Sequence, residues 1–258
     1  MKKIRIILAL LSFSVCAVIA YCVYRYYAPP RLRQPYLTPQ QDDTLRIAYI
    51  GDSWAFVHKD HNYQISQLIE DSIHRSVKVH SYGICGLTSK EIYENLFDNS
   101  DLKHFFQNRG YEYCLVSVGI NDTYKKMSTI YYQQSMDAII QFLLHNNIHP
   151  IILEIPDYNI QKAYERQKLY RKMIRHLSMH INNTPMDCKL PFRNALDKLL
   201  HEKEYENKVN VIRYKCWNND YIHDLRQLYK PDGMHLNEKG YAVLDSMIAK
   251  AILEDLSK

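Results

Sequence analysis

The sequence predicts an α/β fold in which a parallel sheet is covered by helices on both faces, giving a three-layer α/β/α sandwich. Short apolar runs of strand length alternate along the chain with longer segments whose apolar residues recur at helical spacing. Most of the short runs are continuously apolar, which is typical of strands that are buried on both faces of a parallel sheet. The elements are expected at the following positions in chain order.

Five strands are expected, at residues 45–50, 77–82, 113–118, 148–155 and 209–214. Helical segments are expected at 63–73, at 89–106 as one or two short helices, and at 129–146, 163–181, 189–206 and 238–256. In the last of these, the apolar stripe consists of Val243, Leu244, Met247, Ile248, Ala251 and Ile252. No internal repeat or low-complexity segment interrupts this order.

The N-terminal segment has the pattern of a signal anchor. Lys2, Lys3 and Arg5 precede an uncharged, mostly apolar run at 6–24, which is long enough to span a bilayer as a helix. A cleaved signal peptide opens in the same way, but the candidate cleavage site at 18–20 is poor. We therefore expect a membrane anchor that places the domain outside the cytoplasm, in the periplasm or at the cell surface. Cleavage would instead give a secreted protein, and basic residues at both ends leave the orientation open.

The chain divides into three expected parts. Residues 1–28 form the signal anchor, and residues 29–44 form an exposed tether because Pro29 and Pro30 prevent the helix from continuing. Residues 45–258 then form one domain, which is long enough for a substantial core.

The composition excludes several function classes. The net charge of +5 in 258 residues is mild and gives no basis for binding nucleic acid. The densest basic stretch, at 161–176, is interpreted as a solvated helix face rather than a site for an anionic polymer or a membrane surface. Tyrosine is abundant, with 22 residues, which suits ordinary packing or a wet surface for sugars.

No metal or cofactor site is predicted. His176 and His180 are four residues apart on an expected helix, but they lack a third ligand nearby. Cys114 lies in an apolar run and is expected to be buried and inert, whereas Cys188 and Cys216 can be paired or free.

Candidate functional residues follow the strands. Ligands of parallel sheets bind at the carboxyl ends of the strands, so a catalytic group should come directly after one. Four stretches meet this condition or lie just before the last helix: Gly51-Asp52-Ser53, Gly83, Gly119-Ile120-Asn121-Asp122, and Asp232-Gly233-Met234-His235. Each alone is a common turn, but their joint occurrence predicts one site at this edge of the sheet.

These motifs resemble the SGNH hydrolases, also called the GDSL esterase/lipase family, over about residues 45–256. The residues that give the family its name are matched by Ser53, Gly83, Asn121 and His235. The chain departs from the family at Ser81, where the second block usually begins with Asn. The resemblance implies a flavodoxin-like fold with a five-stranded sheet in the order 2-1-3-4-5.

The resemblance also implies a role for each residue. Ser53 would be the nucleophile, His235 its base and later the acid, and Asp232 the group that orients the imidazole. The backbone N–H groups of Ser53 and Gly83 and the side-chain amide of Asn121 would form the oxyanion hole. Asp52 and Asp122 are interpreted as supporting residues of their loops, and Trp54 either lines the pocket or packs beneath the first helix.

The predicted function is a serine esterase that removes short acyl groups, with acetyl the expected group, from carbohydrate. Its expected partners are an acylated carbohydrate or other small ester, and the membrane through the N-terminal helix. A lipase or lysophospholipase and an O-acyltransferase with the same triad are the alternatives. A non-catalytic glycan-binding module is disfavoured because the nucleophile, base and oxyanion donors are all present.

Overall fold

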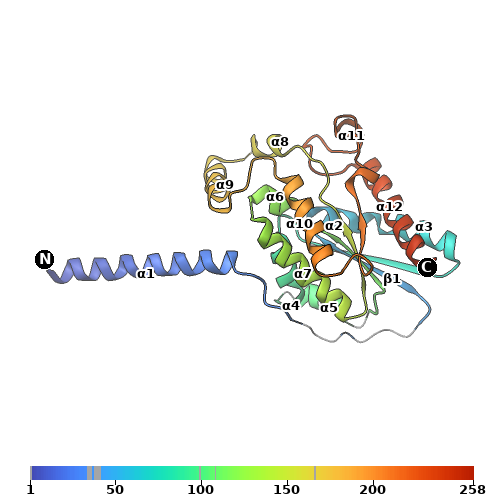
Figure 1. The fold of residues 1–258 in the computed structure, drawn as a ribbon, viewed down its shortest axis with the longest axis horizontal. Helices are drawn as coiled ribbons and strands as arrows, with labels where there is room; N and C mark the ends of the chain where they lie inside the picture. The colour runs from blue at the N-terminus through green and yellow to red at the C-terminus, as the bar shows by residue number, and fades with distance from the viewer. Residues whose placement is uncertain (1, 34–36, 38–41, 99, 108, 166) are drawn as a thin grey trace.

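The computed structural model describes residues 2–258 apart from 34–36, 38–41, 99, 108 and 166. Figure 1 shows a rounded domain from which a single long helix, α1, projects to one side. The domain contains one five-stranded sheet in the order β2-β1-β3-β4-β5. Every neighbouring pair of strands is parallel, which confirms the predicted sheet and strand order. The strands are β1 (Leu45–Gly51), β2 (Val77–Gly83), β3 (Tyr113–Ser117), β4 (His149–Leu153) and β5 (Asn210–Ile212).

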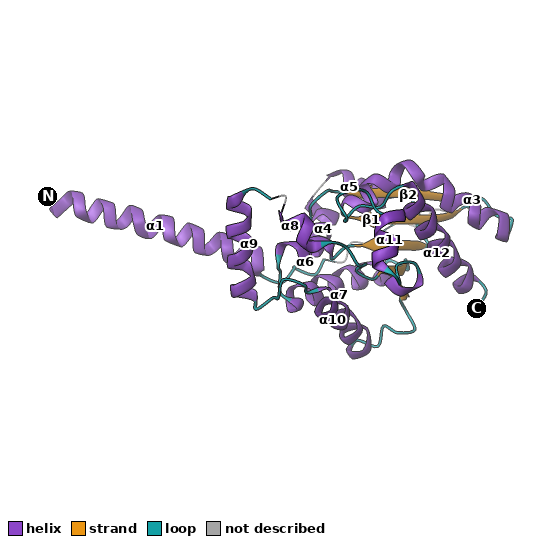
Figure 2. Ribbon diagram, turned by 90° about the horizontal axis from the view of Figure 1, so that it is seen from above, coloured by secondary structure: helices purple, strands orange, loops and turns teal. Residues whose placement is uncertain are grey.

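Helices form a layer on each side of this sheet (Figures 1 and 2). On one side α3 packs against α12, and on the other α7 packs against α4 and α10. The predicted three-layer sandwich is therefore confirmed. The helices of these layers are α3 (Asn62–Ile73), α4 (Ser89–Asp98), α5 (Ser100–Phe106), α7 (Thr129–His145), α10 (Lys189–Glu202) and α12 (Glu238–Leu256).

The helix predictions were wrong in two respects. The single helix expected at 163–181 is two helices, α8 (Ile160–Glu165) and α9 (Leu169–Asn182), and Lys168 adopts an extended conformation at the N-cap of α9. Short helices also occur at positions for which no helix was predicted, because six or seven residues are too few for apolar residues to recur at helical spacing. They are α2 (Ser53–His58), α6 (Ile120–Lys125) and α11 (Tyr221–Gln227).

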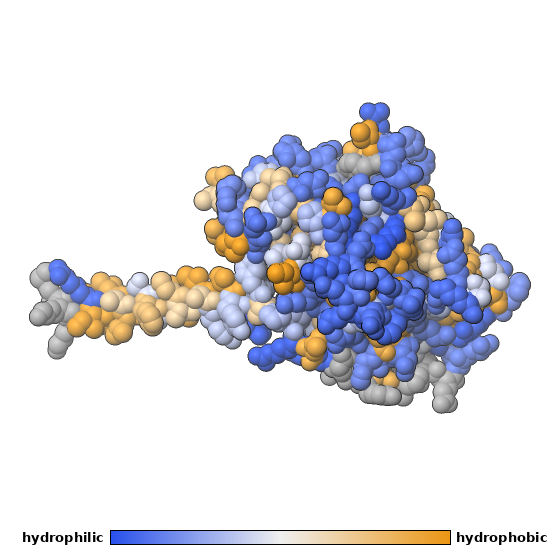
Figure 3. All heavy atoms as spheres, viewed as in Figure 1, coloured by the Kyte–Doolittle hydropathy of each residue, from blue (hydrophilic) through white to orange (hydrophobic). Residues whose placement is uncertain are grey.

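The N-terminal helix α1 (Lys2–Tyr27) is an exposed apolar rod (Figure 3). Its segment Ile4–Tyr27 is long and apolar enough to cross a membrane, as expected of a signal sequence or an anchor. The C-terminal end of α1 is held on the domain by Lys90 of α4. The Lys90 ammonium donates hydrogen bonds to the carbonyl oxygens of Arg25 at 2.7 Å, Tyr26 at 3.1 Å and Ala28 at 2.6 Å.

The predicted tether lies partly outside the described residues, since 34–36 and 38–41 are not among them. Several of its described residues, among them Arg33 and Leu37, are hydrogen-bonded to the domain. The N–H of Arg33 donates to the hydroxyl of Tyr93 at 2.8 Å, and the N–H of Leu37 donates to Asn146 Oδ1 at 3.0 Å. These hydrogen bonds hold the backbone at Arg33 and at Leu37 against the domain.

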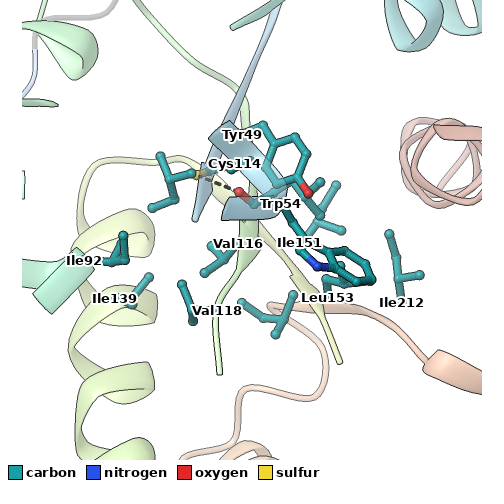
Figure 4. Packing of buried hydrophobic residues seen from close by; sticks show 14 of the residues in the cluster. Tyr49, Trp54, Ile92, Cys114, Val116, Val118, Ile139, Ile151, Leu153 and Ile212 are labelled. Carbon is teal, nitrogen blue, oxygen red and sulfur yellow. Dashed lines mark hydrogen bonds between the residues drawn. The ribbon is translucent and has the colours of Figure 1, made fainter. Parts of the chain in front are cut away.

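The hydrophobic core surrounds the central strands (Figure 4). Tyr49 and Trp54 are fully buried and lie among aliphatic side chains of β3, β4 and β5. Cys114 is also fully buried, as predicted, and its Sγ lies 3.7 Å from the carbonyl oxygen of Leu115. Burial raises the pKa of the Cys114 thiol well above its usual range, so the thiol is inert.

A buried polar network connects four elements beside this core. His58 Nε2 lies 2.6 Å from Asp245 Oδ1 of α12, and His58 Nδ1 lies 3.1 Å from Asn62 Oδ1 of α3. Ser81 of β2 donates its hydroxyl to the same Asn62 oxygen. The Ser81 position, where the chain departs from the SGNH pattern, therefore takes part in packing between helices and sheet.

Replacing Asp245 by alanine is expected to lower the free energy of unfolding by about 2–4 kcal/mol, because it leaves His58 buried without its partner. Urea unfolding of the two proteins measures this difference. The matched control is Ser246→Ala, since Ser246 is exposed on the same helix and donates its hydroxyl to the carbonyl oxygen of Ala242 within that helix. If Asp245→Ala lowers the free energy of unfolding no more than Ser246→Ala does, the His58–Asp245 contact does not stabilise the fold as stated.

Candidate active site

Ser53 is presented by a sharp strand-to-helix turn. β1 ends at Gly51, and Ser53 is the first residue of α2. Asp52 caps this helix, since its Oδ1 accepts the N–H of Trp54 at 3.0 Å. Glycine is required before the turn because a Cβ at position 51 would lie 2.3 Å from the carbonyl oxygen of Ser117. The turn therefore lies tightly against β3 and leaves Ser53 partly exposed at the edge of the sheet.

The structure brings Ser53 together with His235 and Asp232, although 182 residues separate the serine from the histidine. Ser53 Oγ lies 2.9 Å from His235 Nε2. His235 Nδ1 lies 2.8 Å from Asp232 Oδ2. With the proton on Nδ1, the imidazole donates to the carboxylate and Nε2 accepts the serine hydroxyl. The three side chains then form a continuous hydrogen-bonded chain.

Asp232 is held in its ionised form. Partial burial acts to raise its pKa, but its Oδ1 accepts the backbone N–H groups of Met234 at 2.8 Å and His235 at 2.9 Å. These bonds, with the imidazole, outweigh the burial and lower the pKa of Asp232 below its usual range. A carboxylate at Asp232 is thus available to stabilise an imidazolium at His235.

Trp54 packs beneath the first helix, which decides between the two alternatives considered for it. The side chain is fully buried, and its indole N–H donates to the carbonyl oxygen of Met234 at 3.2 Å. The hydroxyl of Tyr241 in turn donates to the carbonyl oxygen of Trp54 at 3.3 Å. Trp54 therefore connects the Ser53 helix with the loop that carries His235, a contact that sequence spacing could not indicate.

Gly83 lies directly against the Ser53 turn. β1 and β2 pair so that Gly51 is opposite Gly83. A Cβ at position 83 would lie 2.1 Å from the backbone nitrogen of Phe56 and 2.5 Å from the carbonyl oxygen of Asp52. Any side chain at this position would displace α2, so only glycine permits this approach.

The side-chain amide of Asn121 also lies next to the Ser53 turn. Asn121 lies at the start of α6, and its Nδ2 donates to Asp52 Oδ2 at 3.0 Å. An amide nitrogen has two N–H donors. The bond to Asp52 uses one of them and orients the side chain, so the second remains for a ligand.

Asp52 and Asp122 are buried carboxyls that support these loops. Asp122 accepts the N–H of Ser89 at 2.9 Å and its hydroxyl at 2.7 Å. Burial raises the pKa of Asp52 to about 7 and that of Asp122 to about 6. Both side chains are fully buried, so they position neighbouring groups and do not contact a substrate.

An open cavity of about 710 Å³ begins beside Asn121. Gly86 and Tyr124 line it near the site, and it extends between the end of α1 and helix α9. The α1 side is lined by Cys22, Val23, Tyr26 and Tyr27, and the α9 side includes Ile174, Leu177 and Ile181. Much of this lining is apolar.

The remaining cysteines and histidines do not form a site in the described part of the chain. Cys188 and Cys216 are free thiols, the first buried and the second exposed, so the alternative of a disulfide between them is not adopted. His176 and His180 lie 3.1 Å apart between their Nε2 atoms. The described residues contain no group of three or more metal-ligating side chains around them or elsewhere.

No protein-family model matches the chain, and no curated protein sequence matches it significantly. Solved structures do match. The lipase/acylhydrolase from Enterococcus faecalis is 15% identical with a TM-score of 0.53, covering 81% of this chain and 95% of that one. A GDSL-like lipase from Bacteroides thetaiotaomicron is 14% identical with a TM-score of 0.50, covering 81% and 88%. A variant of Axe2, an acetyl-xylooligosaccharide esterase from Geobacillus, is 11% identical with a TM-score of 0.53, covering 81% and 94%.

These structures share the fold of this chain over four-fifths of its length, at identities that establish the fold alone. The predicted fold, a three-layer α/β/α sandwich with sheet order 2-1-3-4-5, is therefore one that this chain shares with solved GDSL-like lipases and acylhydrolases.

The raised pKa of Asp52 makes stability depend on pH. Its folded value of about 7 exceeds the ordinary 3.8, so the folded state binds this proton more tightly. The resulting stabilisation is fully present below about pH 4 and is lost as the pH rises through 7. Between pH 4 and 7, the unfolding free energy of the wild type should therefore fall relative to Asp52→Asn, by up to about 1.4 kcal/mol per pH unit.

Denaturant unfolding across this pH range measures the slope, which is unaffected by any constant loss from altered hydrogen bonds. Asp71→Asn, at an exposed position of α3, is the matched control and should keep the wild-type slope. Equal slopes for Asp52→Asn and the wild type would contradict the raised pKa.

Proposed function

We propose that the protein is a serine carboxylic ester hydrolase with Ser53 as its nucleophile. The observation that carries this proposal is the hydrogen-bonded chain from Ser53 Oγ through His235 to Asp232 at the carboxyl edge of the sheet. A serine hydroxyl is a weak nucleophile until a base accepts its proton, and this geometry supplies the base and its orienting carboxylate. The shared fold with lipases and acylhydrolases supports the same reaction class.

The reaction proceeds in two steps. His235 Nε2 takes the proton of Ser53 as Oγ attacks the ester carbonyl, and Asp232 stabilises the resulting imidazolium. His235 then protonates the leaving alkoxide, which departs as the alcohol and leaves an acyl group on Ser53. Water, deprotonated by the same histidine, attacks this acyl-enzyme, releasing the carboxylic acid and restoring the serine.

The oxyanion formed in each step is assigned to donors at Ser53, Gly83 and Asn121. The close packing of Gly83 against the Ser53 turn brings two backbone segments to one point, and the bond to Asp52 holds the Asn121 amide beside them. Donors that are already oriented need no rearrangement when the charge develops.

The favoured substrate class is a short-acyl ester of carbohydrate, with acetyl as the group removed. One structural neighbour is described as an acetyl-xylooligosaccharide esterase. The abundance of tyrosine supports this preference less than the composition suggested, because ten tyrosines are buried among those whose side chains the structure describes. A longer, amphiphilic ester is the second candidate, and the apolar cavity that runs from Asn121 toward α1 favours it.

For localisation, we propose that α1 is retained as an anchor and that the domain lies outside the cytoplasm. Three hydrogen bonds from Lys90 to the end of α1 support retention, since a helix that is removed early has no need of a fixed place on the domain.

Ser53→Ala is expected to abolish ester hydrolysis by the full chain in detergent while leaving the fold intact. The measurement compares p-nitrophenyl acetate with longer acyl esters for the wild type, Ser53→Ala and the exposed-serine control Ser72→Ala. Activity confined to short chains supports the carbohydrate-ester assignment, and a preference for long chains supports the amphiphile. Equal activity in wild type and Ser53→Ala would remove Ser53 as the nucleophile.

Asn121→Ala is expected to lower kcat by about a hundred- to a thousandfold, with a smaller change in KM, because it removes a donor that acts on the developing charge. Steady-state kinetics on p-nitrophenyl acetate measure both constants. The variant should unfold at a lower denaturant concentration than the wild type because the buried Asp52 Oδ2 loses its donor, so the kinetics are compared on protein that is folded in the absence of denaturant. A kcat close to that of the wild type would exclude Asn121 from the oxyanion hole.

A further inference from the structure

Helix α9 exposes its apolar side. Six large apolar residues along this helix are between 54% and 75% exposed: Leu169, Tyr170, Met173, Ile174, Leu177 and Ile181. At 100° per residue they form one continuous face of the helix. The basic residues Lys168 and Arg171 are exposed, as expected of a solvated helix face, whereas Arg175 is buried.

The opposite, polar side of α9 packs on the domain. The guanidinium of Arg175 lies 4.5 Å from the ring centre of Tyr124 and 4.7 Å from that of Tyr164, and the residue is only 3% exposed. Asn182 Nδ2 donates to the carbonyl oxygen of Lys126 at 2.7 Å. Cation–π contacts and hydrogen bonds thus fix the polar side inward, which directs the apolar side outward.

The exposed face lies beside the membrane-crossing helix. Figures 1 and 2 both place α9 on the side of the domain from which α1 projects, and α9 runs crosswise to α1. Ile174 and Leu177 of α9 line the same cavity as Cys22 and Tyr26 of α1. In Figure 3 the orange surface at α9 lies next to the orange surface of α1.

The depth of α9 relative to a bilayer follows from the length of α1. The apolar stretch of 24 residues is about 36 Å long as a helix, against about 30 Å for the hydrocarbon core. Its last turns therefore reach the headgroup region, where tyrosine is enriched. Four tyrosines are found there, namely Tyr21, Tyr24, Tyr26 and Tyr27. Since α9 shares a cavity with residues 22–27, it lies at this interfacial depth.

The charges on α9 fit an anionic surface. The helix has no aspartate or glutamate. Arg171 borders the apolar face on one side and Lys172 and His176 border it on the other, while His180 lies just inside that second edge. An apolar face flanked by basic residues is the pattern of helices that lie in the plane of a membrane interface.

We propose that α9 lies in the headgroup–acyl boundary of the bilayer that α1 crosses, with its apolar face in the lipid. This surface is distinct from the proposed catalytic groups and does not depend on their activity. If the proposed esterase function also holds, the cavity beside Asn121 opens at the membrane surface, which deepens that proposal toward esters presented by the membrane.

The test uses the full chain, with the exposed Cys16, Cys22, Cys85 and Cys216 replaced by serine. A single cysteine is introduced by Leu177→Cys and labelled with an environment-sensitive fluorophore. The matched control is Ile222→Cys, because Ile222 is 76% exposed and its helix, α11, lies farther from α1 than α9 does in both views. Each protein is reconstituted into phosphatidylcholine–phosphatidylglycerol vesicles that contain nitroxide-labelled lipid.

The label at position 177 is expected to be quenched by the nitroxide lipid at least about threefold more strongly than the label at 222. Equal quenching at the two positions would overturn the proposal. A label at 177 that is shielded without lipid quenching, and becomes exposed when the protein is diluted in excess lipid, would assign the face to a second copy of the chain and also overturn it.

Arg171→Glu with Lys172→Glu tests the charge complementarity. In this background, the gain in quenching at 177 on adding phosphatidylglycerol to phosphatidylcholine should fall by more than half. An unchanged gain would contradict the contribution of these residues. The lipid quenching is read out separately from hydrolysis, so failure of this proposal and failure of the esterase assignment are distinguished.

Discussion

The site depends on the close approach of backbone to backbone at the ends of β1 and β2. Gly51 leaves space for the carbonyl of Ser117, and Gly83 leaves space for the first turn of α2. A side chain at either position would push the serine turn away from the sheet. Because this contact is made by main chain alone, the nucleophile is located by the rigid part of the fold rather than by a mobile loop.

Buried aromatic and polar groups connect the Ser53 turn to the loop that carries His235. The Trp54 indole joins α2 to the Met234 carbonyl, while Asp52 joins the same turn to Asn121. The structure accommodates two buried carboxyls to obtain this positioning, at Asp52 and Asp122. Such groups lower stability near neutral pH and persist where they organise a site.

Periodicity predicted the sheet, and the resemblance to the SGNH hydrolases implied the order of its strands. The polar motifs that follow the strands include Ser53, Asp232 and His235, which the structure brings together. Parallel strands are buried on both faces, so their apolar runs stand out, and the polar motifs follow them at regular places. The short helix after Ser53 was missed because its six residues make fewer than two turns, too few for apolar residues to recur at helical spacing. Trp54, His58 and Asp245 could not be paired from sequence, since the contacts join positions 180 and 187 residues apart. Periodicity grouped the apolar residues of α9 correctly, but it cannot say whether that face points to the core or away from it.

The three bonds from Lys90 determine how the domain is carried by its helix. A flexible linker would let the domain rotate relative to its helix. Instead, the Lys90 ammonium donates to three carbonyl oxygens at the end of α1 and restricts that rotation. With α1 retained as the anchor that we propose, a rigidly attached domain would keep one side toward the bilayer surface. Its encounters with molecules in that surface are then two-dimensional, and their frequency depends on the number per unit area rather than on the concentration in solution.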